Sequence, residues 1–249
     1  MTFEEFSRGD SPLHQRDTRV KITGTFALIL VVALCHSFYT GLAALLLGCI
    51  LLLLSRLDCR AVFKRLLVVN GFIVFLWLTL PFTYPGESIA FPFLQLSRPG
   101  LELAALITLK TNSIVLFFIT LLATSTVAEL GHGLEGLRLP TKLCLLLLFT
   151  YRYIFVINQE YQRLARAAKL RCFRPGTNLH SYRTYAHLFA MTLVKSWNRA
   201  ERVRQAMILR GFQGRFYRLQ EQVAGRGDLV FLGAMLTSVL GLIGIEMRS

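Results

Sequence analysis

The chain has 249 residues, of which 54% are hydrophobic, and its mean hydropathy is +0.51. This composition is too apolar for a soluble domain and predicts an integral membrane protein. A net charge of +14 would suggest nucleic-acid binding in a soluble protein, but here it must first be compared with the Lys and Arg excess of cytoplasmic loops. The five cysteines and five histidines are scattered, in no pattern typical of a disulfide framework or a zinc site.

The N-terminal segment, residues 1–21, is polar and ends in basic residues directly before the first apolar run. This arrangement predicts a cytoplasmic N-terminus and no cleaved secretory signal. Residues 22–54 are mostly apolar and are interrupted at His36–Gly41. The run is too long for one span of about 20 residues and long enough for two short ones. We therefore expect a helical hairpin.

A third span is expected after a basic cytoplasmic loop. The basic residues of this loop are Arg56, Arg60, Lys64 and Arg65. The span covers Leu66–Leu80 and ends at Pro81, because proline cannot continue the hydrogen-bond ladder of a helix. Residues 82–100 contain three prolines and a single basic residue, Arg98, which is typical of an outer loop.

The fourth span, about Leu101–Thr124, carries Lys110 and Asn112 near its middle. An unpaired charge at this depth costs a few kcal/mol on insertion scales. Two interpretations follow: Lys110 faces protein, or the helix is shifted and Lys110 extends to an interface. After this span, the break at Leu137–Pro140 is placed on the cytoplasmic side.

Hydropathy and charge disagree over Leu143–Ile157. The segment is apolar, but it has only about 15 residues and carries Arg152. If it crossed, the most basic half of the chain would lie outside, because 14 of the 28 Lys and Arg residues fall in 158–228, against four acids. The positive-inside rule therefore predicts that the segment lies at the interface or beneath the other helices and continues into the first basic helix.

Two basic helices follow, one ending at Arg171 before Pro175–Gly176 and one covering about 185–210, and a last span covers Leu229–Ile245. The sequence thus predicts an all-α integral membrane protein with about five transmembrane helices and two or three cytoplasmic helices. The expected regions are the cytoplasmic N-terminal segment 1–21, a four-helix transmembrane region 22–142, the cytoplasmic region 143–228, and the last transmembrane helix with the C-terminus, 229–249.

The two basic helices end in the same pattern, Arg-x3-Ala-x2-Leu-Arg-x-Phe. Arg163, Ala167, Leu170, Arg171 and Phe173 recur 39 residues later as Arg202, Ala206, Leu209, Arg210 and Phe212. A solvated basic face explains a single copy. Two matched copies favour docking on two equivalent partner surfaces, because the planar fork of arginine suits a carboxylate-lined groove. The apolar face of the second helix is Leu193, Trp197, Ala200, Val203 and Met207, with Arg199, Arg202 and Arg210 on the other flank.

These motifs resemble the transmembrane T component of energy-coupling factor (ECF) transporters, whose coupling helices end in Ala-Arg-Gly-type triplets. The triplets here are Leu170-Arg171-Cys172 and Leu209-Arg210-Gly211. Several further motifs resemble those of the cobalt/nickel branch, the CbiQ family. They are Ser11–His14 with Asp17, Arg19 and Lys21, Leu137–Pro140, Tyr151–Tyr153, Arg199–Val203 and Ala206–Met207. Leu170 and Leu209 replace Ala, and Thr18 replaces Pro. Cys172 replaces Gly, which predicts a less sharp end to the first helix and unequal coupling at the two ends.

The resemblance implies a scaffold in a prokaryotic cytoplasmic (inner) membrane, with its N-terminus and coupling helices in the cytoplasm. Its partners would be two ABC-type ATPases, a metal-binding S component, a small accessory membrane subunit in some assemblies, and the lipid bilayer. No catalytic, cofactor or metal site is expected in this chain, and ATP and Mg would belong to the ATPases. The residues expected to contact partners or support the structure are Asp17, Arg19, Lys21, Lys110, Pro140, Arg152, Arg199, Arg202 and Met207.

Three other interpretations were weighed. The second choice within the family is a T component for another micronutrient, such as a vitamin, because another subunit selects the substrate. Membrane-anchored nucleic-acid binding is disfavoured, since the aromatic residues among the basic ones have no spacing typical of a stacking platform. Attraction of the basic surface to anionic lipid is compatible with the T-component interpretation.

Overall fold

The computed structural model describes residues 11, 13, 16–83, 88–91, 94–214 and 226–248. Two compact units make up the chain. The first contains residues 1–137 and 221–249, and the second contains residues 138–220.

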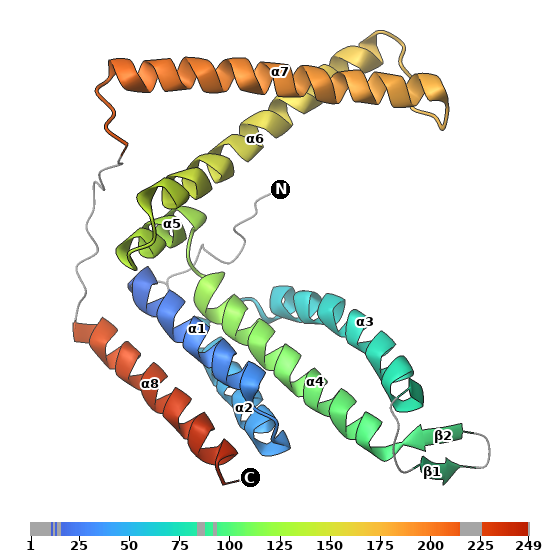
Figure 1. The fold of residues 1–249 in the computed structure, drawn as a ribbon, viewed down its shortest axis with the longest axis vertical. Helices are drawn as coiled ribbons and strands as arrows, with labels where there is room; N and C mark the ends of the chain where they lie inside the picture. Colours follow the sequence, from blue (N-terminus) through green and yellow to red (C-terminus); the bar gives the residue numbers. More distant parts are fainter. Residues whose placement is uncertain are drawn as a thin grey trace. The chain divides into compact units, whose positions relative to one another are not determined.

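The first unit is a helical bundle (Figure 1). Its helices are α1 (Thr18–Leu34), α2 (Phe38–Ser55), α3 (Cys59–Thr83), α4 (Arg98–Phe117), α5 (Val127–Gly136) and α8 (Arg226–Glu246), and α4 continues directly into a π-helix, Phe118–Leu122. Helix α1 packs against α8, α4 and α5, while α2 and α3 pack against α4. Two short antiparallel strands, β1 (Ser88–Phe91) and β2 (Leu94–Ser97), form a ribbon between α3 and α4 where the sequence predicted only a loop.

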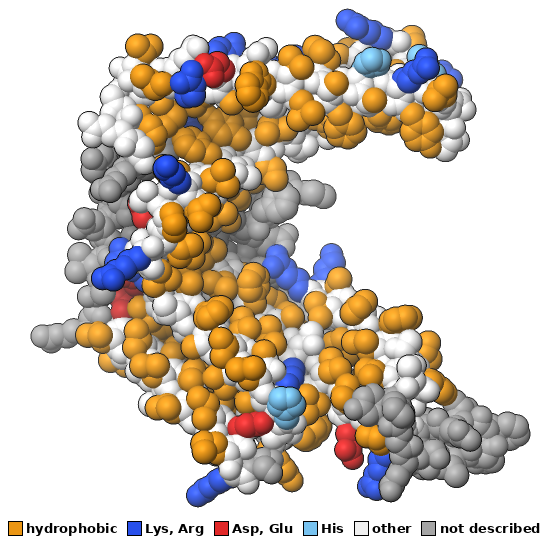
Figure 2. Space-filling view, viewed as in Figure 1, with side chains coloured by type: hydrophobic (Ala, Val, Ile, Leu, Met, Phe, Trp, Pro, Cys, Tyr) orange, Lys and Arg blue, Asp and Glu red, His pale blue; other side chains and the backbone are white. Residues whose placement is uncertain are grey.

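The core of this bundle is apolar and lies between α1, α2, α4 with its π-helix, and α8. Leu28, Ala44, Phe117 and Leu121 are fully buried in it. Large apolar side chains also cover the outside of the bundle, as Figure 2 shows. An apolar exterior around an apolar core is the surface expected of helices that face lipid.

Five helices are long and apolar enough to cross a membrane, by length and composition alone: α2, α3, α4 with its π-helix, α6 and α8. The predicted all-α fold class with about five transmembrane helices is confirmed, but the five helices are not the same ones that the sequence predicted. Helix α1 has 17 residues and falls outside this set, although the prediction included it. Helix α6 (Thr141–Leu170) falls inside it, because its apolar segment continues without a break into the basic one. The membrane side of residues 143–228 stays a prediction.

Helix α3 begins earlier than its apolar residues suggested. Arg60, Lys64 and Arg65 lie on its first turns, so the predicted loop reduces to the short turn around Asp58. Pro81 lies inside the last turn and the helix ends at Thr83, so the prediction that Pro81 ends the helix is wrong. A proline near the end of a helix costs only one hydrogen bond, which allows the final residues to remain helical.

Several polar side chains join the helices of the bundle. The side-chain amides of Asn70 on α3 and Asn112 on α4 exchange hydrogen bonds at 3.0 and 3.1 Å. Half-buried Lys110 donates to the carbonyl oxygen of Ala33 at 3.2 Å, so its charge is directed toward protein. The Glu246 carboxylate accepts from the His36 amide at 2.7 Å and from Ser37 and Thr40, and thereby caps the N-terminus of α2.

The second unit consists of two long helices, α6 and α7 (Leu179–Leu209), joined by a turn at residues 171–178. The helices cross each other, and their C-terminal ends lie on opposite sides of the crossing (Figure 1). Phe173 in the turn packs edge-to-face against Tyr185, and Tyr161 on α6 stacks on Phe189 of α7. These ring contacts hold the turn and the crossing together.

Candidate functional site

An ion-pair cluster fixes the crossing of α6 and α7. Glu160 on α6 is 8% exposed. Its carboxylate lies 2.7 Å from Nζ of Lys195, 3.5 Å from Arg163 and 3.6 Å from Arg199. Lys195 and Arg199 reach this carboxylate from α7, whereas Arg163 pairs with it from α6 itself. A network of charges around one carboxylate contributes more than an isolated surface pair. The cluster therefore holds the two helices at one crossing point.

The two copies of the sequence repeat contact each other at matched positions where the helices cross. Glu160 and Arg199, which contact each other, are matched positions of the repeat (199 − 160 = 39). Arg171 and Arg210 each follow by the same interval (171 − 160 = 210 − 199 = 11 residues). At 1.5 Å per residue, each arginine lies about 16 Å along its helix from the crossing. The two helix ends are thus equivalent in sequence and in distance from the shared contact.

Both helices end with the same hydrogen bonds. The Phe173 amide donates to the carbonyl of Ala168, and the Cys172 amide donates to that of Lys169. The Phe212 and Gly211 amides donate in the same way to Met207 and Ile208. Each pair of bonds is a Schellman motif, which satisfies the last carbonyls of a helix and turns the chain sharply away.

The residue in the left-handed conformation differs between the two ends. Cys172 has φ of 61° and Gly211 has φ of 75°. The expectation that Cys172 would give a less sharp helix end is therefore wrong, because the backbone adopts the glycine conformation with a cysteine in place. A residue with a Cβ atom is less stable in this conformation by about 1 kcal/mol or more, and the hydrogen bonds of the motif offset that cost.

The triplets at the two ends are exposed. Leu170 is 86% exposed and Leu209 is 88% exposed, and each is followed by an exposed arginine. A nearly free leucine at the tip of a helix leaves apolar surface in water, which has a cost that contact with a partner would remove. Each end therefore presents one apolar and one cationic group for recognition.

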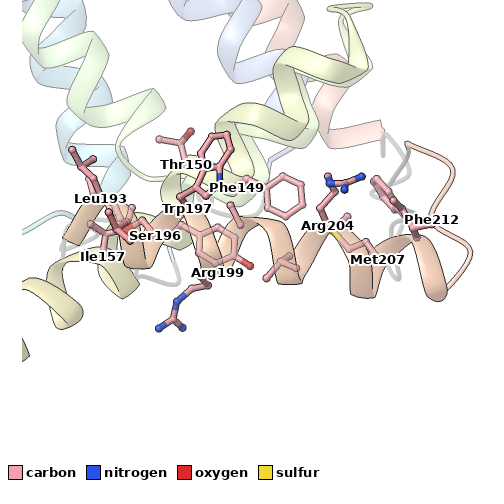
Figure 3. Close-up of a pocket in the computed structure, with 16 residues that line it drawn as sticks. Phe149, Thr150, Ile157, Leu193, Ser196, Trp197, Arg199, Arg204, Met207 and Phe212 are labelled. Carbon is pink, nitrogen blue, oxygen red and sulfur yellow. The ribbon is translucent and has the colours of Figure 1, made fainter. Parts of the chain in front are cut away.

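An apolar groove of about 1010 Å³ runs between α6 and α7 (Figure 3). Phe149 and Ile157 line it from α6, and Trp197 and Met207 line it from α7. Arg199 points away from the apolar residues in Figure 3, consistent with its ion pair to Glu160. The predicted apolar face of the second basic helix thus lies exposed along this groove.

A separate polar cluster in the first unit contains the predicted N-terminal residues. Asp17 caps α1 by accepting from the Arg19 amide at 3.0 Å, and the Asp17 amide donates to Asp228 of α8 at 3.2 Å. Lys21 is fully buried and its Nζ atom donates to Ser125 at 3.0 Å. The Arg19 side chain lies against Gly136 at the end of α5. These contacts join α1, α5 and α8, so the cluster has a structural role in the bundle.

The remaining predicted residues lie apart from one another. Pro140 precedes the first residue of α6, and Arg152 is exposed on that helix. Arg202 is exposed on α7, while Met207 lines the groove. Lys110 belongs to the bundle contact with Ala33. Of these residues, Arg199 takes part in the ion-pair cluster between α6 and α7, and Met207 lines the groove between the two helices.

Glu160 was missed by sequence reasoning, although a signal was available. It is one of four acids among the 14 basic residues of 158–228, and a lone carboxylate in such a segment must attract several cations. Within the described ranges, no group of three or more His, Cys, Asp and Glu side chains is placed to hold a metal ion.

Comparison with known proteins gives consistent matches along the whole chain. Residues 9–222 match the family model CbiQ, described as cobalt transport protein. The energy-coupling factor transporter transmembrane protein EcfT of Thermanaerovibrio acidaminovorans is 28% identical over 261 residues, covering 99% of this chain and 96% of that protein. EcfT of Streptococcus equi subsp. equi is 24% identical, covering 97% and 94%. EcfT of Exiguobacterium sibiricum is 27% identical, covering 83% of each.

Proposed function

Because the chain belongs to the CbiQ family of cobalt transport proteins, we propose that it is the transmembrane T component of an ECF transporter that imports cobalt or nickel. In this role it joins two cytoplasmic ATPases to a separate membrane subunit that binds the metal. The proposal is carried by one observation, the two matched helix ends on α6 and α7.

Each helix end would dock on one ATPase. The exposed leucine enters an apolar depression, and the adjacent arginine pairs with carboxylates of the ATPase. Two ends at equal distances from one crossing suit two equivalent ATPases, since the same contact can form twice. ATP and Mg²⁺ belong to these partners, and this chain contributes no catalytic group.

The crossing would convert ATPase motion into motion of the whole unit. When the ATPases close on ATP, they bring together the surfaces that hold Arg171 and Arg210. Because the Glu160 cluster fixes α6 to α7, the helices tilt as a pair instead of sliding past each other. Rigid-body tilting of this kind transmits a displacement over the length of a helix.

The apolar groove would receive the metal-binding membrane subunit. Its lining is almost entirely apolar, with Trp197 and Leu193 strongly exposed. An apolar helix surface of the metal-binding subunit would bury these side chains. In the proposed topology the N-terminus and residues 143–228 are cytoplasmic, which agrees with the 14 basic residues of 158–228.

A T component for another micronutrient, such as a vitamin, is the second candidate. It is favoured by the names of the relatives, which state ECF transport without a cargo. The helix ends and the groove would work in the same way for either cargo, because the substrate is bound by another subunit.

Affinity purification of the full chain from its native membrane, followed by mass spectrometry, tests the proposal. We expect two ATPase subunits per chain, one metal-binding membrane protein and, in some preparations, a small accessory subunit. Radioactive cobalt or nickel uptake by the same cells then identifies the cargo. Recovery of the chain without any ATPase would contradict the T-component role, whereas ATPases with a vitamin-binding subunit would select the second candidate.

A further inference from the structure

A second groove, of about 760 Å³, lies between the first turns of α3 and the end of α4 with its π-helix. Arg60, Lys64 and Arg65 line one part of it, and Val68, Val69 and Phe118 line another. This surface is not used by the helix ends or by the groove of the α6–α7 unit. We call it the basic groove.

The basic groove is charged at one end and apolar at the other because of the order of residues along α3. Arg60, Lys64 and Val68 are spaced four residues apart, so they lie in one row on the helix surface. The cations come first and the valine follows one turn later. A ligand lying along this row meets positive charge and then hydrocarbon within about 12 Å.

The π-helix shapes the opposite wall. Its wider turn is marked by the Ala123 amide, which donates to the Phe118 carbonyl five residues earlier at 3.0 Å. Phe118 is 52% exposed, whereas its neighbour Ile119 is 2% exposed and Phe117 is fully buried. The π-helix therefore exposes one aromatic ring to the groove, while Ile119 lines the same groove from a buried position. Such turns occur frequently at functional sites.

Arg60 and Lys64 are the two cations of the groove that are available to a ligand. Among the ion pairs of the described residues, none involves Arg60 or Lys64, and both side chains are exposed. Figure 2 shows blue side chains beside the N-terminal end of α3 and orange side chains along the helix. Val68 is 72% exposed on this apolar surface. Positive charge thus lies at the end of a helix whose sides are suited to lipid.

We propose that the basic groove binds one anionic phospholipid. Arg60 and Lys64 hold the headgroup phosphate through charge-assisted hydrogen bonds, and an acyl chain lies along Val68, Val69 and Phe118. A zwitterionic lipid binds more weakly, because its headgroup brings a cation beside the two basic side chains. The bound lipid anchors α3 against α4, and this role is the same for a metal or a vitamin cargo.

Native mass spectrometry of the purified full chain, titrated with phosphatidylglycerol or phosphatidylcholine of equal chain length, tests the headgroup contact. The wild type should retain one phosphatidylglycerol in preference to phosphatidylcholine. Arg60→Gln with Lys64→Gln should weaken phosphatidylglycerol binding about 25-fold, at about fivefold for each cation near a lipid surface. Arg174→Gln with Arg183→Gln removes the same charge from exposed positions of the second unit and should leave binding unchanged. Equal retention of both lipids, or equal losses in both double variants, would overturn the proposal.

The acyl-chain contact is tested without changing charge. Val68→Trp should fill the apolar end and reduce retention of phosphatidylglycerol, while Leu67→Trp, at an exposed position outside the groove, should not. A photo-crosslinking amino acid at position 118 in otherwise wild-type chain should give a lipid adduct in native membranes. A protein adduct at this position would show that another chain occupies the groove and would overturn the proposal, even where the charge variants fail to fold.

Discussion

The C-terminal ends of α6 and α7 have the same backbone geometry. They differ in the residue at the position of positive φ, where this geometry favours glycine. Gly211 adopts positive φ with little cost, whereas Cys172 adopts it against the preference of a residue with a side chain. The hydrogen bonds at the two ends nevertheless correspond one to one. The comparison teaches that equivalence of the two ends is set by the whole motif and its distance from the crossing, and that one unfavourable residue does not remove it.

Removing both arginines should have the largest effect. If each arginine docks on an ATPase as proposed, Arg171→Ala with Arg210→Ala leaves carboxylates of the ATPases without their partner, which costs about 2–5 kcal/mol per interface. We expect loss of ATPase co-purification and of substrate uptake, with normal amounts of chain in the membrane. Wild-type uptake at equal expression would remove the coupling role from both ends.

The single variants sharpen the comparison. Because the two ends share their geometry, Arg171→Ala and Arg210→Ala should reduce uptake by equal factors. Arg→Lys at either end should restore part of the uptake, since lysine keeps the charge and loses the bidentate fork. Uptake of cobalt or nickel in cells expressing each variant gives the ratio. A clearly larger loss for Arg210→Ala would show that Cys172 weakens its end after all.

Glu160→Gln should weaken the contact between α6 and α7 from which the two helix ends are equally distant. Lys195, Arg163 and Arg199 then lose the carboxylate that holds them together. We expect uptake to fall on the order of tenfold, within the range of coupling between distant sites, while each ATPase still binds. The control is Glu201→Gln: that carboxylate bonds within its own helix to Arg204 at 2.6 Å, which lowers the pKa of Glu201. Reduced ATPase binding in Glu160→Gln would assign Glu160 to docking instead.

Exchanging the residues at positive φ should have the smallest effect. Cys172→Gly should stabilise the end of α6 by about 1 kcal/mol, and Gly211→Cys should destabilise the end of α7 by a similar amount. A Cβ atom at Gly211 would meet no other group within 4 Å, so the cost comes from the backbone alone. Hydrogen exchange at the amides of Phe173 and Phe212 measures both changes. Unchanged protection in both variants would contradict the strain at Cys172.

Much of this site was predictable from the sequence. The 39-residue repeat identified both helix ends, and the spacing of Trp197 and Met207 identified the apolar face that lines the groove. These features depend on local periodicity, which the sequence carries directly.

The wrong predictions concern features that depend on contacts between residues far apart in the sequence. Arg60 was placed in a loop because charge was taken as the end of a helix, although the basic residues lie on the first turns of α3. The conformation of Cys172 depends on hydrogen bonds to carbonyls already fixed by α6. Contacts of Glu160 with Lys195 require knowledge of where two helices cross, which no periodicity provides.

The cap that Glu246 places on α2 sets an order of events during synthesis. The amides of His36 and Ser37 receive their acceptor from a residue made 210 positions after His36. At typical translation rates of 5–20 residues per second, that interval is about 10–40 seconds. During this time the start of α2 must satisfy its amides with water or lipid headgroups. The first hairpin is therefore completed only when the last helix arrives, and a nascent chain stopped before Glu246 retains an uncapped α2.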